Sequence, residues 1–267
     1  QLDGQTTILD GVERMHHRPI GQLVDALREI GADIEYLGEE GFPPLRIKGS
    51  ILDKHRIVTI NNPLSTQYIS ALLLIGANVI TNSTSPYIYI TQEVIKQYQL
   101  SPFSFHLSVE KDWSSAAFWY EYVALHGGEI KLPGLHKESL QGDKVVADIF
   151  AHLGIHTTYT AEGAVISSSP LHPTPYTLHH DFVACPDLYP AVALTCERLG
   201  IQLHATGVES LPLKESDRLR AVAEHRTDAD HRMAMALLIA GYEVDDTACI
   251  SKSYPCFLDH LRQLYEK

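Results

Sequence analysis

A two-domain α/β fold is predicted from three features of the sequence. Candidate helices and strands alternate along the whole chain, the arrangement that gives sheets covered by helices. One helix–strand–strand unit occurs in two places, and repeats of this size indicate stacked equivalent modules. The length of 267 residues suits two domains of roughly 100 to 200 residues each.

The clearest helical pattern covers residues 19–30. Its apolar side chains recur on one helix face, Pro19 suits the first turn, and Gly31 ends the helix. The same periodicity predicts helices at residues 65–75, 87–98, 114–126, 142–153, 190–199 and 215–225.

Strands are predicted where short β-rich runs lie between turn residues, at residues 33–37, 45–48 and 56–60. The repeated unit links such strands to helices. Residues 26–36 and 150–159 each contain a helix end, a glycine and a strand that ends near a tyrosine, and a Glu-Gly turn and another strand follow. Chance similarity between two amphipathic helices is the alternative. We place the boundary between the two domains after residue 108, which gives domains 1–108 and 109–267.

Charge and composition restrict the partners. The formal net charge is −12, from 21 basic and 33 acidic residues, which disfavours binding to nucleic acid or to an acidic membrane surface. The longest apolar run, residues 71–77, is too short to span a bilayer. Four separate cysteines without a C-x-x-C pair indicate a reduced, cytoplasmic protein.

Histidine is frequent, with 15 residues, and two pairs are adjacent in sequence. Adjacent side chains point apart on a strand and about 100° apart on a helix, so these pairs are poorly placed to bind one metal ion. We therefore expect polar surface histidines and no metal site. Separately, we expect no cofactor.

The segment 213–219 is the most informative candidate site. On a helix that starts near Lys214, Lys214 and Arg218 are four residues apart and share a face, while Glu215 lies about 100° away. Because helix starts attract anions, this pattern indicates an anion site. An ordinary solvated first turn with an i,i+4 ion pair is an equally open alternative.

Two further cations follow this segment. Arg232 stands where a loop that contains Asp228 and Asp230 meets the apolar run 233–240, and a guanidinium there can bind a carboxylate or phosphate. The two aspartates can equally be no more than a helix N-cap. Lys252 lies between serines near the C-terminus, where most lysines are surface residues.

The first half of the chain has two comparable helix starts. Arg18 directly precedes the proline that opens the helix at residues 19–30, where free backbone N–H groups attract anions. Ser65, Thr66 and Gln67 stand at the front of the next helix, and they can either cradle a phosphate or simply cap the helix.

Taken together and in order, these pieces resemble the enolpyruvyl transferase family. The matching strings are residues 14–21, 65–73, 85–88, 109–116, 186–187, 213–219, 230–236 and 252–255. The resemblance implies an inside-out α/β barrel in each of two domains, built from repeated helix–strand units, with substrates bound in the cleft between the domains.

The strings are most similar to the shikimate branch of the family, which implies a reaction. The enolpyruvyl group of phosphoenolpyruvate is transferred to the 5-hydroxyl of shikimate 3-phosphate, and phosphate leaves after addition and elimination through a tetrahedral intermediate. This step belongs to chorismate and aromatic amino-acid biosynthesis, and the resemblance implies a cytoplasmic monomer.

The resemblance also implies roles for particular residues. Asp187 is similar to the carboxylate that holds and deprotonates the reacting hydroxyl, and Glu215 to the proton donor to the methylene carbon. Lys252 counts as catalytic and as a phosphoenolpyruvate ligand, together with Arg18, Gln67, Arg218 and Arg232. The shikimate 3-phosphate ligands are expected to be Ser65, Thr66, Thr84, Tyr87, Ser210 and Lys214.

The sequence departs from the family pattern at its N-terminal part. A lysine followed by serine and arginine has no counterpart, so we expect the first domain to be incomplete. The connection at residues 224–228 is also shorter than in the family. One alternative is therefore a non-catalytic relative or fragment that binds anions. A second alternative is transfer to UDP-N-acetylglucosamine, as in the sister branch.

Overall fold

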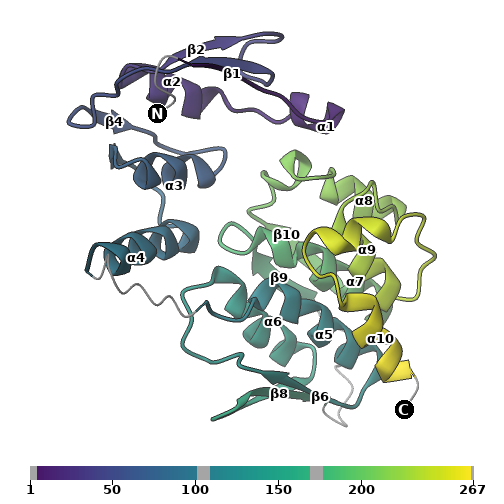
Figure 1. The fold of residues 1–267 in the computed structure, drawn as a ribbon. Coiled ribbons are helices and arrows are strands. Elements are labelled where there is room, and N and C mark those ends of the chain that lie inside the picture. The colour runs from purple at the N-terminus through teal and green to yellow at the C-terminus, as the bar shows by residue number, and fades with distance from the viewer. Residues whose placement is uncertain (1–4, 101–108, 169–176, 266–267) are drawn as a thin grey trace. The chain divides into compact units, whose positions relative to one another are not determined.

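The computed structural model describes residues 5–100, 109–168 and 177–265 (Figure 1). Contacts between Cα atoms divide the chain into two compact units, Gln1–Ser108 and Val109–Lys267, called here the first and second unit. Residues 101–108, which precede the predicted domain boundary, lie outside the described part.

The first unit opens with an antiparallel sheet that carries one helix. Its strand order is β1-β3-β2, so β3 pairs with both neighbours. The helix α2 presents Val24 and Ala26 to the interior, where Val24 lies in a small core with Ile34 and Leu45. The elements are β1 (Thr6–Leu9), α1 (Glu13–His16), α2 (Gly21–Glu29), β2 (Asp33–Tyr36) and β3 (Leu45–Lys48).

A parallel βαβ motif and a further helix complete the first unit. The strands β4 and β5 pair in parallel, as a strand–helix–strand crossover requires. Val58, Ile69 and Leu72 are buried in the core beneath them. The elements are β4 (Ile57–Thr59), α3 (Gln67–Leu74), β5 (Asn78–Ile80) and α4 (Pro86–Leu100).

The second unit repeats this plan after an additional helix. Its antiparallel sheet has the order β6-β8-β7, and β9 and β10 pair in parallel around α7. The elements of this part are α5 (Trp113–His126), β6 (Glu129–Pro133), η1 (Gly142–Val145), α6 (Val146–His152), β7 (Ile155–Thr160), β8 (Gly163–Ser168), β9 (Thr177–Asp181), η2 (Pro186–Leu188), α7 (Tyr189–Leu199) and β10 (Gln202–Thr206). The remaining elements are η3 (Leu211–Leu213), α8 (Arg218–Glu224), α9 (His231–Ile239), η4 (Ala248–Lys252) and α10 (Phe257–Tyr265).

The predicted helix–strand–strand repeat is confirmed. It corresponds to α2-β2-β3 and α6-β7-β8, and in both places a preceding strand joins the sheet at the same position. Gly163 in the second copy shows why the turn needs glycine. Its φ is +140°, and a Cβ there would lie 2.4 Å from the carbonyl oxygen of Leu132 and 2.6 Å from the nitrogen of Gly134.

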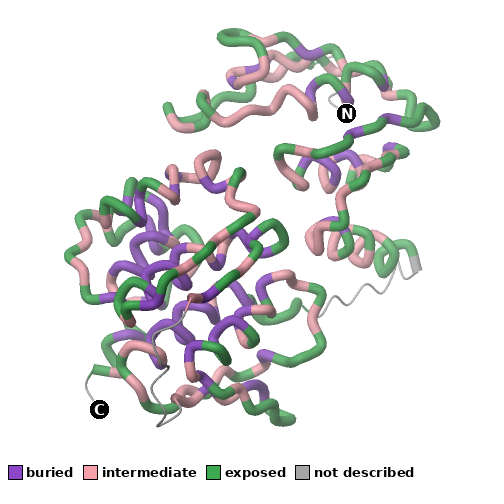
Figure 2. Tube along the Cα trace, turned by 180° about the vertical axis from the view of Figure 1, so that it is seen from behind, coloured by how far each residue is buried: buried purple, intermediate pink, exposed green. Residues whose placement is uncertain are grey.

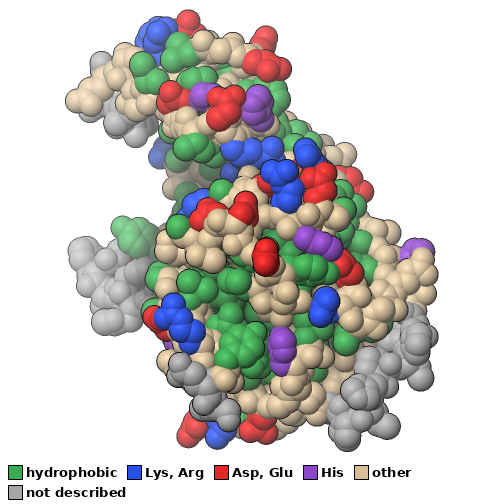
Figure 3. Space-filling model, turned by 90° about the vertical axis from the view of Figure 1, so that its right-hand side faces the viewer, with side chains coloured by type: hydrophobic (Ala, Val, Ile, Leu, Met, Phe, Trp, Pro, Cys, Tyr) green, Lys and Arg blue, Asp and Glu red, His purple; other side chains and the backbone are tan. Residues whose placement is uncertain are grey.

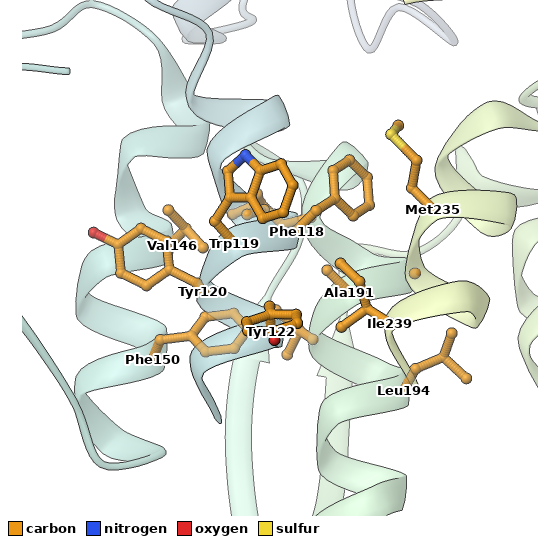
Figure 4. Close-up of a cluster of buried hydrophobic side chains, with 14 of the residues drawn as sticks. Phe118, Trp119, Tyr120, Tyr122, Val146, Phe150, Ala191, Leu194, Met235 and Ile239 are labelled. Atoms are coloured by element: carbon orange, nitrogen blue, oxygen red, sulfur yellow. The ribbon is translucent and has the colours of Figure 1, made fainter. Parts of the chain in front are cut away.

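Helices form the interior of the second unit. The helix α5 is buried on every side over most of its length, the property of a helix enclosed by other elements. Its aromatic side chains pack with residues of α6, α7 and α9, as Figure 4 shows. In Figure 2 the buried positions of this unit concentrate on these helices, while much of the sheets is exposed or intermediate.

Two predicted helices differ in their first turns. Residues 142–145 form a 3-10 turn before α6, and residues 214–217 are not helical. Lys214 is extended, with ψ −166°, and α8 begins only at Arg218 because the Asp217 side chain caps it by accepting from the Arg220 N–H at 3.2 Å. The expected helix face shared by Lys214 and Arg218 is therefore wrong. Among the described residues, no helix combines the length and apolar character needed to cross a membrane.

Candidate active site

A cluster of opposite charges surrounds Asp187 in the second unit. Asp187 lies in the η2 turn directly before α7, where Pro186 occupies the first position. Segments distant in sequence bring the other members to it. We define the Asp187 cluster as Asp187, Lys214, Glu215, Arg218, Asp230 and Arg232.

Asp187 binds three cations through its two carboxylate oxygens. Oδ1 accepts from Arg218 Nη1 at 2.6 Å and lies 3.4 Å from Lys214 Nζ, and Oδ2 lies 3.1 Å from Arg232 Nη2. Burial alone would raise the pKa of this carboxyl, but Arg232, Arg218 and Lys214 together hold it well below its usual range. Asp187 is therefore ionised at neutral pH.

Arg218 is the buried centre of the cluster, with a side chain only 1% exposed. Besides Asp187, its Nε donates to Asp230 Oδ2 at 2.9 Å and its Nη2 to Glu215 Oε2 at 3.0 Å. Burial alone would lower the pKa of the guanidinium, but Asp230 and Asp187 raise it above its usual value. Three carboxylates thus hold one guanidinium in a fixed orientation.

Asp230 connects the two arginines. Its side chain is fully buried, and while Oδ2 accepts from Arg218 and from Ser216 Oγ at 3.1 Å, Oδ1 accepts from the backbone N–H of Arg232 at 2.9 Å. The last bond makes Asp230 the N-cap of α9. One carboxylate therefore fixes both the Arg218 side chain and the helix start that carries Arg232.

A further buried carboxylate, Asp143, interacts electrostatically with Asp187 and Arg232 of this cluster. It is 2% exposed and accepts a hydrogen bond from the Ser114 hydroxyl through Oδ2, whereas Oδ1 has no hydrogen-bond partner among the described residues. Burial, followed by the negative charge of Asp187, raises the pKa of Asp143 to about 6. With it, four carboxylates face three cations in this part of the unit.

The second unit holds two further predicted residues, Lys252 and Ser210, of which Lys252 contacts the backbone beside the cluster. Lys252, at the end of η4, donates from Nζ to the carbonyl oxygen of Ala229 at 3.0 Å, so it contacts the backbone directly before Asp230. Ser210 precedes η3, where its backbone carbonyl accepts from the Leu213 N–H at 3.1 Å. In the described part of the chain, no hydrogen bond joins the Ser210 side chain to the cluster.

Predicted residues of the first unit gather at two helix starts. The residues next to Arg18 contact α3, because the Tyr68 hydroxyl donates to the carbonyl of Pro19 and the Leu64 N–H donates to Gln22 Oε1 at 2.9 Å. Arg18 therefore lies near the start of α3, where Ser65, Thr66 and Gln67 stand. Ser65 Oγ accepts from the Gln67 N–H at 3.3 Å, while Thr66 occupies the N-cap position without a side-chain cap bond.

Thr84 and Tyr87 flank the start of α4, which packs against α3. One hydrogen bond between the two helices joins the hydroxyls of Ser70 and Thr91 at 2.7 Å. The first unit thus holds Ser65, Thr66, Gln67, Thr84 and Tyr87 at the starts of two neighbouring helices, with Arg18 near the first of them.

Charge on the protein surface is mixed. Figure 3 shows basic and acidic side chains interspersed on the face that it presents, with hydrophobic side chains between them. Within the described residues, no three His, Cys, Asp or Glu side chains are placed to hold a metal ion.

Sequence reasoning considered Asp230 only as a possible helix N-cap and assigned no role to Asp143 or Ser216. Asp230 had a local signal, since an aspartate two residues before Arg232 fits an N-cap, and the structure has this cap. Asp143 and Ser216 had none, because their partners Ser114 and Asp230 are 29 and 14 residues away in sequence.

Comparison with known proteins identifies the family. The model of the family described as EPSP synthase (3-phosphoshikimate 1-carboxyvinyltransferase) matches residues 1–101, 75–226 and 222–261. A 3-phosphoshikimate 1-carboxyvinyltransferase of Bacteroides fragilis is 36% identical over 317 aligned positions, covering 96% of this chain and 76% of the relative. One of Cellvibrio japonicus is 30% identical, covering 98% and 75%. The alignments are longer than this chain, so the relatives have residues within the matched region that it lacks.

Solved structures share the fold. An EPSP synthase of Acinetobacter baumannii superposes with a TM-score of 0.65 at 18% identity, covering 97% of this chain and 74% of that one. The enolpyruvyl transferase NikO of Streptomyces tendae gives 0.64 at 13% identity, covering 98% and 73%. The predicted α/β enolpyruvyl transferase fold is therefore confirmed. From the family model and the relatives together, we conclude that this chain belongs to the EPSP synthase family.

Proposed function

We propose that this protein transfers the enolpyruvyl group of phosphoenolpyruvate to the 5-hydroxyl of shikimate 3-phosphate and releases inorganic phosphate. The observation that carries the proposal is the Asp187 cluster, in which one ionised carboxylate lies among three cations. Many reactions use a site for anionic substrates. Membership of the EPSP synthase family favours this one.

The chemistry of the substrates fits these side chains. Both substrates carry a phosphate and a carboxylate, which Lys214, Arg218 and Arg232 are suited to neutralise. The reaction also needs one group to remove the hydroxyl proton and another to protonate the methylene carbon. We assign the first role to Asp187 and the second to Glu215, whose side chain is 39% exposed and so accessible to a substrate.

The remaining assignments follow the family. We propose that residues 1–108 and 109–267 are the two enolpyruvyl transferase domains. Addition and elimination need no cofactor, and we expect a cytoplasmic monomer. The other proposed phosphoenolpyruvate ligands are Arg18, Gln67 and Lys252, and the other shikimate 3-phosphate ligands are Ser65, Thr66, Thr84, Tyr87 and Ser210.

Phosphate release tests the proposal. Phosphate should appear only when phosphoenolpyruvate and shikimate 3-phosphate are both present. Replacing Glu215 by glutamine should lower kcat much more than it changes KM, because the proton donor acts only in the chemical step. Binding of both substrates without release would favour a non-catalytic anion-binding protein. Release with UDP-N-acetylglucosamine instead would assign the chain to the sister reaction.

A further inference from the structure

The Asp187 cluster is already neutralised without any ligand. Asp187 occupies Lys214 and Arg232, two of the cations that an incoming phosphate would need. A carboxylate and a phosphate compete for the same donors on lysine and arginine. An anion that enters this cluster therefore meets Asp187 as a competitor for Lys214 and Arg232.

We propose that Asp187 is an internal anion that holds Lys214 and Arg232 until a substrate phosphate displaces it, so that phosphate binding itself frees the carboxylate to accept a proton. The proposal rests on the proposed function in one respect: the anion that displaces Asp187 is taken to be a substrate phosphate. Asp187 would thus be inert before binding and basic after it.

The three cations differ in burial, which indicates which of them can exchange Asp187 for a ligand and which one keeps it. Arg218 is 1% exposed and is held by Asp187, Glu215 and Asp230, so of the three cations it is the least able to exchange Asp187 for a ligand. The side chains of Lys214 and Arg232 are 24% and 15% exposed, so a ligand can reach both. Displacement therefore removes two of the three cations from Asp187 and leaves the third.

The surrounding charges favour proton uptake when an anion enters. Asp187 is faced by Asp143 from η1, by Lys214, Glu215 and Arg218 at the start of α8, and by Asp230, His231 and Arg232 at the start of α9, with Cys185 directly before η2. Counting Asp143 with the Asp187 cluster, four carboxylates already face three cations. An added dianion repels these carboxylates, and bound protons relieve that repulsion.

Sulfate binding to the full chain tests the competition. Sulfate is a dianion that stays unprotonated near neutral pH, so any proton uptake belongs to the protein. By titration calorimetry, Asp187→Asn should bind sulfate about tenfold more tightly than the wild type, because the competitor is removed. Asp187→Glu should remain close to the wild type, since it keeps the competing charge.

Glu215→Gln is the matched control. It removes one negative charge from the same cluster, but Glu215 contacts Arg218 rather than the cations that exchange. Its sulfate affinity should stay within about threefold of the wild type. Equal affinities in Asp187→Asn and Glu215→Gln would overturn the proposal, as would the absence of sulfate binding from every variant.

A second measurement counts protons. Calorimetry at pH 6.5 in two buffers with different heats of ionisation counts the protons taken up with each sulfate. It is made on Asp143→Asn, because the pKa of Asp143 is itself raised to about 6, and the proposal predicts uptake in this variant as in the wild type. Zero uptake would overturn it even if Asp187→Asn failed to fold. Neither measurement depends on turnover, so an inactive chain would contradict the proposed function and leave this inference standing.

Discussion

Replacing Asp230 by alanine should strongly destabilise the second unit. The change removes the acceptor of three hydrogen bonds, from Arg218 Nε at 2.9 Å, Ser216 Oγ at 3.1 Å and the Arg232 N–H at 2.9 Å. The side chain is fully buried, so solvent cannot replace these bonds.

The size of the effect follows from two contributions. Loss of an N-cap typically costs about 1 kcal/mol. Breaking a buried ion pair costs about 3 to 5 kcal/mol, and the lower end applies here because Arg218 keeps Asp187 and Glu215. We expect the free energy of unfolding to fall by about 4 kcal/mol at pH 7. Asp230→Asn should lose less, since asparagine also caps helices well.

Urea unfolding followed by tryptophan fluorescence measures the free energy of unfolding of the second unit. Both tryptophans of the chain, Trp113 and Trp119, lie on α5, so their signal reports the unfolding of the second unit. Asp259→Ala on α10 is a matched control because its ion pair with Arg262 is exposed, and it should cost less than about 1 kcal/mol. A loss below about 1.5 kcal/mol for Asp230→Ala would refute the reasoning.

Three further substitutions test other buried positions. Glu121→Gln should raise the free energy of unfolding by about 1 to 3 kcal/mol at pH 7, because folding buries an ionisable carboxyl whose oxygens have no hydrogen-bond partners in the described part of the chain, and glutamine removes the cost of its charge. Burial raises the pKa of Glu121, so the wild type loses stability as pH rises above the unfolded value near 4.5; urea titrations should show the advantage of the variant growing with pH, not shrinking. Asp143→Asn should remove a loss of wild-type stability between about pH 4 and pH 6, because the pKa of Asp143 is raised to about 6, and melting curves with the opposite pH slope would contradict this. Gly163→Ala should cost at least about 3 kcal/mol, because the new Cβ would clash with the backbone of Leu132 and Gly134, and an unchanged melting temperature would contradict this.

Local patterns predicted much of the fold. The helix at residues 19–30 and the strand at 45–48 agree with α2 and β3 within one or two residues, because proline, glycine and apolar periodicity act over short distances. The start of α8 was predicted too early. The charged residues 214–217 suit a helix by composition, but the cap formed by Asp217 delays it to Arg218.

The site was less accessible from sequence. Arg218 binds Asp187 and Asp230, which are 31 and 12 residues away, and no local pattern specifies such pairs. The charge pattern of residues 213–219 pointed to Arg218, and the family resemblance pointed to Asp187, but neither showed that the two side chains bind each other. Which cation holds which carboxylate, and the place of Asp143 beside them, became visible only in three dimensions.

We propose that the Asp187 cluster is the catalytic centre. The most direct test is kcat for Asp187→Asn with phosphoenolpyruvate and shikimate 3-phosphate both saturating, on protein shown to be folded by its tryptophan fluorescence. We expect kcat to fall by at least about 100-fold, because the reacting hydroxyl loses its proton acceptor. A folded variant that keeps kcat within a few-fold of the wild type would contradict it.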